Sequence, residues 1–149
     1  MTPTLQRVAR TDAGLASELR LSVMRLRRRL AGEREPGNQL SVGALSVLGV
    51  LFRGGECTVG QLADHEWVRP PSMTRTVNCL VDAGYAVRRS AEHDKRQVLI
   101  SITDMGKQTL HADRRRRDAW LAQRLRELTP HERAVLREAA PIIERLATA

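Results

Sequence analysis

The sequence is poor in aromatic residues and in cysteine. Aromatic side chains make up 3% of its 149 residues, and its two cysteines are Cys57 and Cys79. They are not spaced as a CxxC pair, so they predict neither a structural zinc site nor a redox disulfide. The interior must therefore be built mainly from leucine, valine, alanine, isoleucine and methionine, a composition that suits packed helices.

Long hydrophobic runs are absent as well. No segment approaches the roughly 18 consecutive apolar residues of a membrane-spanning helix. The first residues, Met1 to Thr4, lack the charged start and apolar run of a signal peptide. We therefore expect a cytoplasmic protein with no membrane partner.

Motifs for catalysis are missing too. The four histidines, at positions 65, 93, 111 and 131, are scattered, and none lies in an HExxH motif. Gly54-Gly55 is followed by Glu56 and Cys57, which does not fit a phosphate-binding loop. We therefore expect no enzyme activity, no cofactor and no metal.

Positive charge is what the chain has in excess. Lysine and arginine number 25 against 17 acidic residues, which gives a formal net charge of +8. Such a surface attracts polyanions, and nucleic acid is the natural one.

Helix start and stop signals organise the first half of the chain. Thr11 or Asp12 and then Ser41 suit N-caps, and Thr58 with Gln61 forms a capping box. Pro70 and Pro71 fit the first turn of another helix, where a missing N–H costs little, and Gly84 fits its C-terminal cap. The predicted helices span about 12–33, 41–54, 58–67 and 70–84.

After Gly84 the pattern changes from helical to alternating. Tyr85, Val87 and Arg89, then Val98, Ile100 and Ile102, predict a β-hairpin whose polar tip is residues 92–96. Thr103 begins a long helix to about Leu128. Residues 129–132 form a second capping box, and Pro141 in the final helix predicts a kink or a break.

The order short helix, tight turn, second helix and basic hairpin is that of a winged helix-turn-helix, in which the second helix enters the major groove. We therefore predict a mainly α fold with a small β-hairpin wing. At about 100° per residue, the helix that begins at Pro70 has one apolar face and one polar face. The apolar face holds Met73, Val77, Leu80, Val81 and Gly84; the polar face holds Ser72, Arg75, Cys79 and Asp82, flanked by Pro71 and Asn78.

Arg75 suits base recognition because its guanidinium can donate two hydrogen bonds to one guanine. Ser72 and the first-turn amides can bind phosphate. A lone arginine is more often a solvated surface residue, but its place in this arrangement favours DNA. The alternative is a basic helical module that binds RNA or protein, although the few aromatics are not clustered for base stacking.

Several motifs together resemble the MarR family of bacterial transcriptional regulators. They are the run from Val68 to Val77, then Leu80, Gly84, Asp94-Lys95-Arg96 and Thr103-Asp104-Met105-Gly106. The resemblance covers nearly the whole chain. It implies one domain over residues 1–149, with dimerisation helices at about 12–33 and 104–148 and a winged helix-turn-helix lobe at about 41–103.

The same resemblance implies DNA contacts. In the recognition helix they fall on Pro71, Ser72, Thr74, Arg75 and Asn78. In the wing, Arg96 would enter the minor groove, oriented by Asp94 through a charge-assisted hydrogen bond. Weaker candidates for phosphate contacts are His93, Lys95, Arg88 and Arg89.

The resemblance further implies a homodimer that binds a pseudo-palindromic operator, most often as a repressor, and that a small phenolic or anionic ligand releases. In the helix that starts at Thr103, Arg114 and Arg117 interrupt a leucine stripe and are our candidates for binding that ligand. The alternative is that all four arginines of 114–117 extend into solvent.

Overall fold

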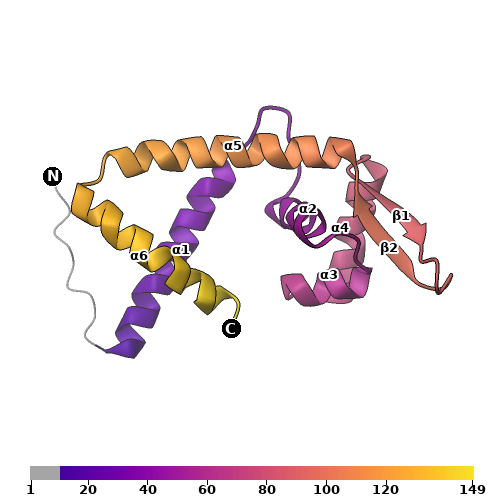
Figure 1. Ribbon diagram of the computed structural model, residues 1–149, viewed down its shortest axis with the longest axis horizontal. Coiled ribbons are helices and arrows are strands. Elements are labelled where there is room, and N and C mark those ends of the chain that lie inside the picture. The colour runs from indigo at the N-terminus through magenta and orange to yellow at the C-terminus, as the bar shows by residue number, and fades with distance from the viewer. Residues whose placement is uncertain (1–10) are drawn as a thin grey trace. The chain divides into compact units, whose positions relative to one another are not determined.

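The computed structural model describes residues 11–149, shown as a ribbon in Figure 1. Within them the fold is mainly α with one antiparallel strand pair, as predicted. The elements are α1 (Asp12–Gly32), α2 (Val42–Gly54), α3 (Val59–Glu66), α4 (Pro70–Asp82), β1 (Ala86–Ser90), β2 (Val98–Ile102), α5 (Asp104–Arg126) and α6 (Pro130–Ala147).

The predicted helix starts are confirmed by their caps. The Thr11 hydroxyl accepts a hydrogen bond from the Gly14 amide at 3.2 Å, and the Ser41 hydroxyl accepts one from Ala44 at 3.0 Å. Both capping boxes are present, at the starts of α3 and α6. Short polar side chains thus satisfy amides that have no partner inside the helix.

The chain divides into two compact units, and each is a body of its own. In the described part of the chain the first comprises residues 11–33 and 116–149, and the second comprises residues 34–115. The second unit therefore contains α2, α3, α4, the hairpin and the first half of α5.

A single hydrophobic core holds the second unit together. Its largest side chains are fully removed from solvent, and they come from four elements, α2, α3, α4 and β2: Leu48, Leu51, Leu62, Val77, Leu80 and Ile100. Burying a leucine-sized side chain contributes about 1.5–3 kcal/mol, so this core fixes the orientation of α4.

One buried carboxylate fastens the segment before α2 to α5. Asp113 is 1% exposed, and its Oδ1 accepts hydrogen bonds from Nδ2 of Asn38 at 3.0 Å and from the Glu35 amide at 3.4 Å. The Asn38 Oδ1 in turn accepts from the Leu40 amide at 2.9 Å. These bonds satisfy backbone groups of a segment that has no helical or strand partner.

The register of the hairpin determines which of its residues face the core. Ala86 pairs with Ile102 and Val87 pairs with Ser101, so Ala86 shares the inner face with Ile100 and Ile102. Val87 lies on the outer face and is 48% exposed. The small Ala86 occupies the inner position, where the hairpin packs closely against α2, α3 and α4.

The first unit buries much less. No described residue of α1 or α6 is buried, although both helices are rich in leucine, isoleucine and valine. Of the kink or break predicted at Pro141, the break does not occur, because α6 continues through this residue to Ala147. A proline that only removes one hydrogen bond can be accommodated where the rest of the helix supports the turn.

Candidate nucleic-acid interface

The two faces of α4 divide as the sequence predicted, except that Gly84, expected on the apolar face, is exposed and lies beyond the end of the helix. Met73, Val77 and Leu80 are 2% exposed or less and anchor the helix to the core. Pro71, Ser72, Thr74, Arg75 and Asn78 are all exposed on the remaining surface. The helix is therefore held by one side and presents polar groups on the other.

The first turn of α4 leaves its charged and polar groups available. Arg69 is the N-cap residue but makes no side-chain cap hydrogen bond, and the prolines follow at once. The Thr74 hydroxyl donates to the Pro70 carbonyl at 3.0 Å, which leaves its oxygen free to accept. Among the described residues, the Arg75 side chain makes no ion pair and no hydrogen bond. Its guanidinium is therefore available for a contact outside the chain.

A side-chain contact joins α4 to the wing. A guanidinium nitrogen of Arg88, on β1, donates to Oδ1 of Asn78 on α4. The strand also packs directly against this helix, and Figure 1 shows the hairpin extending beside it. This hydrogen bond, between two residues that were both predicted to meet DNA, links the recognition helix to the wing in addition to the packing of β1 on α4.

A second contact braces the base of the wing. Arg89 donates two hydrogen bonds to the carboxylate of Glu56, which also accepts from the Ser101 hydroxyl at 2.9 Å. The hydrogen bonds from Arg89, and then that from Ser101, lower the pKa of Glu56 below its ordinary value. The charge of Arg89 is therefore compensated, unlike that of Arg75.

The wing tip is a tight turn closed by its own aspartate. Oδ1 of Asp94 accepts from the backbone amide of Arg96 at 2.9 Å, and the Gln97 amide bonds the Asp94 carbonyl at 3.0 Å. The resemblance implied a bond to the Arg96 guanidinium; the structure instead shows one to the backbone. Asp94 thus shapes the turn, and His93, Lys95 and Arg96 extend from it exposed.

The two arginines chosen for ligand binding lie in different units. Arg114 belongs to the second unit, where its guanidinium lies 5.8 Å from the centre of the Phe52 ring. The same ring meets His111 edge-on at 4.8 Å. Arg117 belongs to the first unit and is partly buried. Arg115 and Arg116 are exposed, so the four arginines do not behave alike.

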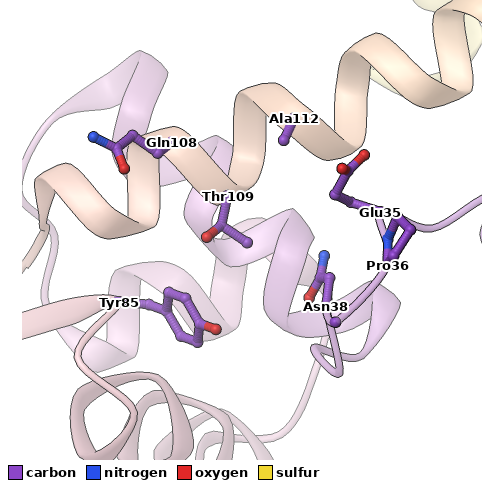
Figure 2. Close-up of a pocket in the computed structure, with 8 residues that line it drawn as sticks. Glu35, Pro36, Asn38, Tyr85, Gln108, Thr109 and Ala112 are labelled. Atoms are coloured by element: carbon purple, nitrogen blue, oxygen red, sulfur yellow. The ribbon is translucent and has the colours of Figure 1, made fainter.

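The second unit also has a shallow hollow, drawn in Figure 2. It measures about 290 Å³ and lies between the segment before α2, Tyr85 and one side of α5. Its lining includes Glu35, Asn38 and Thr109, so its rim is polar and carries a carboxylate. An anion is poorly suited to this hollow.

Sequence reasoning missed three contributors to this geometry. Glu56 and Ser101 brace the wing, and Phe52 places Arg114. None belongs to a motif, since their roles depend on contacts between residues tens of positions apart. For Glu56, the one sequence signal that could have indicated a pairing was an acidic residue in a chain with an excess of positive charge.

A short helix, a turn, an anchored recognition helix and a braced β-hairpin on one core define a winged helix-turn-helix DNA-binding lobe. A family model described as the MarR family matches residues 38–97. An HTH-type transcriptional regulator of Mycobacterium tuberculosis is 46% identical over 133 residues, which is 89% of this chain and 92% of the relative. A Mycobacterium leprae regulator is 45% identical with the same coverage. The chain belongs to the MarR family of transcriptional regulators.

Solved structures agree with this assignment. A putative transcriptional regulator of Pseudomonas aeruginosa superimposes with a TM-score of 0.78 at 31% identity, covering 95% of this chain and 99% of its own. A MarR family protein of Bacillus stearothermophilus has a TM-score of 0.80 at 22% identity, covering 94% and 97%, and supports the fold alone. The family consists of DNA-binding regulators and not of enzymes.

Two kinds of feature are absent from residues 11–149. No helix there is long and apolar enough to cross a membrane. No group of three or more histidine, cysteine or acidic side chains in that range is placed to hold a metal ion.

Proposed function

We propose that this regulator is a homodimeric repressor that binds a pseudo-palindromic operator and is released by a small anionic ligand. One observation carries the DNA-binding part. The contact between Arg88 and Asn78 joins α4 to the wing, while Arg75 and Arg96 project from that piece with no acidic partner among the described residues. Such a rigid, unneutralised surface suits a duplex.

The two arginines have different tasks in this proposal. Arg75 lies near the start of α4 and reads a guanine in the major groove through two hydrogen bonds. The Ser72 hydroxyl donates to a flanking phosphate, and the Thr74 hydroxyl does so once it leaves the Pro70 carbonyl. Arg96 at the wing tip enters the minor groove, where a narrow groove concentrates negative potential. Lys95 and His93 lie beside it against phosphate.

Dimerisation is supported by the apolar surface of the first unit. Leu19, Val23 and Leu26 on α1 are between 37% and 45% exposed, and Ile142 and Ile143 on α6 are 48% and 41% exposed. Unpaired apolar surface of this extent marks a protein interface. A two-fold dimer presents two recognition helices and so demands a pseudo-palindromic site. A protein acting on chromosomal DNA in this way works in the cytoplasm.

The ligand part of the proposal rests on the face between α2 and α5. Lys107, His111 and Arg114 are spaced i, i+4, i+7 on α5 and therefore share one side of it. Nη2 of Arg114 and Nη1 of Arg53 both lie within 3.4 Å of the Cβ position that Gly49 lacks. A hollow of about 330 Å³ is lined by Phe52 and Lys107 and also by Glu56, whose carboxylate is paired with Arg89. Two guanidinium groups beside an aromatic ring suit an aromatic carboxylate.

Removing one arginine at a time tests the DNA contacts. Arg75→Ala should weaken operator binding by about 1–3 kcal/mol and relax the preference at one position of each half-site, with little change on random DNA. Arg96→Ala should weaken both DNAs and flatten the salt dependence. Arg126→Ala, an exposed arginine of the first unit, is the control. Fluorescence anisotropy at several salt concentrations measures all three.

Equal losses of Arg75→Ala on operator and random DNA would refute base reading by that residue. The operator itself comes from selection of genomic fragments by the purified protein, followed by footprinting. The footprint also shows whether the site overlaps a promoter, as a repressor requires.

The alternative of an RNA-binding or protein-binding module is tested by competition. Duplex DNA containing the recovered palindrome should displace the labelled operator at far lower concentration than single-stranded RNA of equal charge. Equal competition by the RNA would favour the alternative, because only non-specific charge would then matter.

Ligand release is tested with salicylate as the probe. Salicylate should lower operator affinity by preferring a dimer whose recognition helices are wrongly spaced. Arg114→Ala and Arg53→Ala should abolish that response, while Arg115→Ala, an exposed neighbour, should keep it. A response unchanged in both variants would remove this face from the mechanism.

A further inference from the structure

Trp67, in the turn between α3 and α4, combines two unfavourable features. It is 88% exposed, the largest value among the exposed large hydrophobic residues of the described chain. It also has φ 55° and ψ 38°, in the left-handed region, where it is the one non-glycine residue with positive φ among residues 11–149. Glycine normally occupies such a position after a helix, since a Cβ is strained there.

The backbone explains the conformation but not the side chain. The Trp67 amide bonds the carbonyls of Ala63 and Asp64, which ends α3 and turns the chain toward α4. A glycine would make the same turn without strain and without exposing an indole. A strained, solvent-exposed tryptophan therefore points to a contact outside the chain.

Trp67 lies close in sequence to the start of α4. Two residues further on, Arg69 is the exposed N-cap of α4, and Ser72 and Arg75 follow on the first turns. Trp67 thus precedes the end of the recognition helix that reads bases. Two acidic residues lie close to Trp67 in the sequence. Glu66 accepts a hydrogen bond from the Ser46 hydroxyl, and Asp64 is exposed on α3.

We propose that Trp67 binds the sugar-phosphate backbone at the edge of the major groove. Its ring packs on a deoxyribose, its indole N–H donates to a phosphate oxygen, and Arg69 bonds the next phosphate. An indole suits this boundary because it has an apolar body and a single donor. Phosphate contacts fix the register of a recognition helix without reading sequence. The inference rests on the proposed function, since it needs α4 to lie in the groove.

Fluorescence reports on this residue directly. The chain has two tryptophans, so Trp120→Phe leaves Trp67 as the sole one. Titration with a random-sequence duplex at low salt, and with the selected operator, should change its emission and reduce its quenching by acrylamide severalfold. Undiminished quenching on saturated DNA would overturn the proposal. Protection that grows with protein concentration without DNA would also overturn it and indicate a contact between copies of the chain.

Variants separate the contact from the fold. Trp67→Gly relieves the left-handed strain, so its melting temperature should equal or exceed the wild-type value, while its affinity for both DNAs falls roughly tenfold. Trp67→Phe, which keeps a ring but lacks the donor, should lose less than Trp67→Gly. Wild-type affinity of Trp67→Gly would overturn the proposal, and wild-type affinity of Trp67→Phe would overturn the phosphate hydrogen bond.

The salt dependence of DNA binding distinguishes the proposed contact of Trp67 from that of Arg69. Trp67→Gly should leave the slope of log affinity against log salt unchanged, because a neutral N–H releases no counterion. Arg69→Ala should reduce that slope by about 1. If Arg75→Ala weakens operator binding but Trp67→Gly does not, the Trp67 contact is wrong while the proposed function stands. If neither variant weakens operator binding, both the Trp67 contact and the proposed function are wrong.

Discussion

The two units of the chain use similar aliphatic residues to different ends. In residues 34–115, Leu48, Leu62 and Leu80 are completely removed from solvent, whereas in the described part of the other unit, 11–33 and 116–149, no side chain is buried. A lobe with its own core can hold α4 rigidly by itself. Helices such as α1 and α6 bury their apolar stripes only when something covers them. The contrast shows that the winged helix-turn-helix lobe has a complete core of its own, whereas the apolar surface of α1 and α6 is left exposed.

The largest expected effect comes from placing a charge on the exposed apolar surface of α1 and α6. Ile143→Glu on α6 should prevent a partner from covering the helix, because burying an unpaired carboxylate is costly. A monomer reaches one half-site at a time, so operator affinity should fall by about 10²–10⁴-fold. Sedimentation and anisotropy measure the two effects. Arg137→Gln, on the opposite face of α6, should change neither, and a wild-type dimer in Ile143→Glu would contradict the assignment of the interface.

The buried core of the second unit should respond differently. Leu48→Ala should lower the free energy of unfolding by about 2–5 kcal/mol, because it removes buried methyl groups and leaves a cavity. The loss should not depend on protein concentration. Ile143→Ala should instead lower stability by an amount that varies with concentration, as expected of a subunit contact. Chemical unfolding at two protein concentrations makes the comparison, and the same concentration dependence in both variants would contradict it.

A glycine at the start of α5 gives a sharper test of how tightly the second unit is packed. A Cβ on Gly106 would lie 2.3 Å from the Tyr85 carbonyl oxygen and 2.8 Å from Cγ1 of Ile102. Gly106→Ala should therefore cost about 1–3 kcal/mol, despite the better helix propensity of alanine. Gly43→Ala, where the nearest atom is the Ser41 Oγ at 3.9 Å, is the control near the start of another helix. A melting temperature of Gly106→Ala equal to the wild-type value would contradict tight packing of Gly106 against Tyr85 and Ile102.

The smallest effect concerns the brace under the wing. Hydrogen bonds from Arg89 and Ser101 lower the pKa of Glu56, so the folded state favours its ionised form. Its contribution to stability is present above the ordinary carboxyl pKa and disappears as the pH falls through the lowered value. Glu56→Gln should therefore flatten the acid side of the stability profile slightly. Carboxyl shifts followed by NMR should show the low titration midpoint of Glu56, and an ordinary midpoint would contradict the brace.

The local elements of this fold were predictable because their signals are local. Thr58 with Gln61 and Thr129 with Glu132 mark helix starts by their spacing alone, and the structure has both capping boxes. The apolar positions Met73, Val77 and Leu80 predicted the buried side of α4, and they are buried. Exposure of Ser72 and Arg75 follows from the same periodicity.

Only the tertiary structure decided what depends on register and on distant contacts. It placed Ala86, rather than Val87, on the inner face of the hairpin, because a strand's period of two fixes the alternation but not which set turns inward. It joined Arg89 to Glu56, and Arg88 to Asn78, across gaps of 33 and 10 residues that no local pattern spans. It also revealed the left-handed backbone of Trp67, since the sequence alone gives composition and spacing but no dihedral angle.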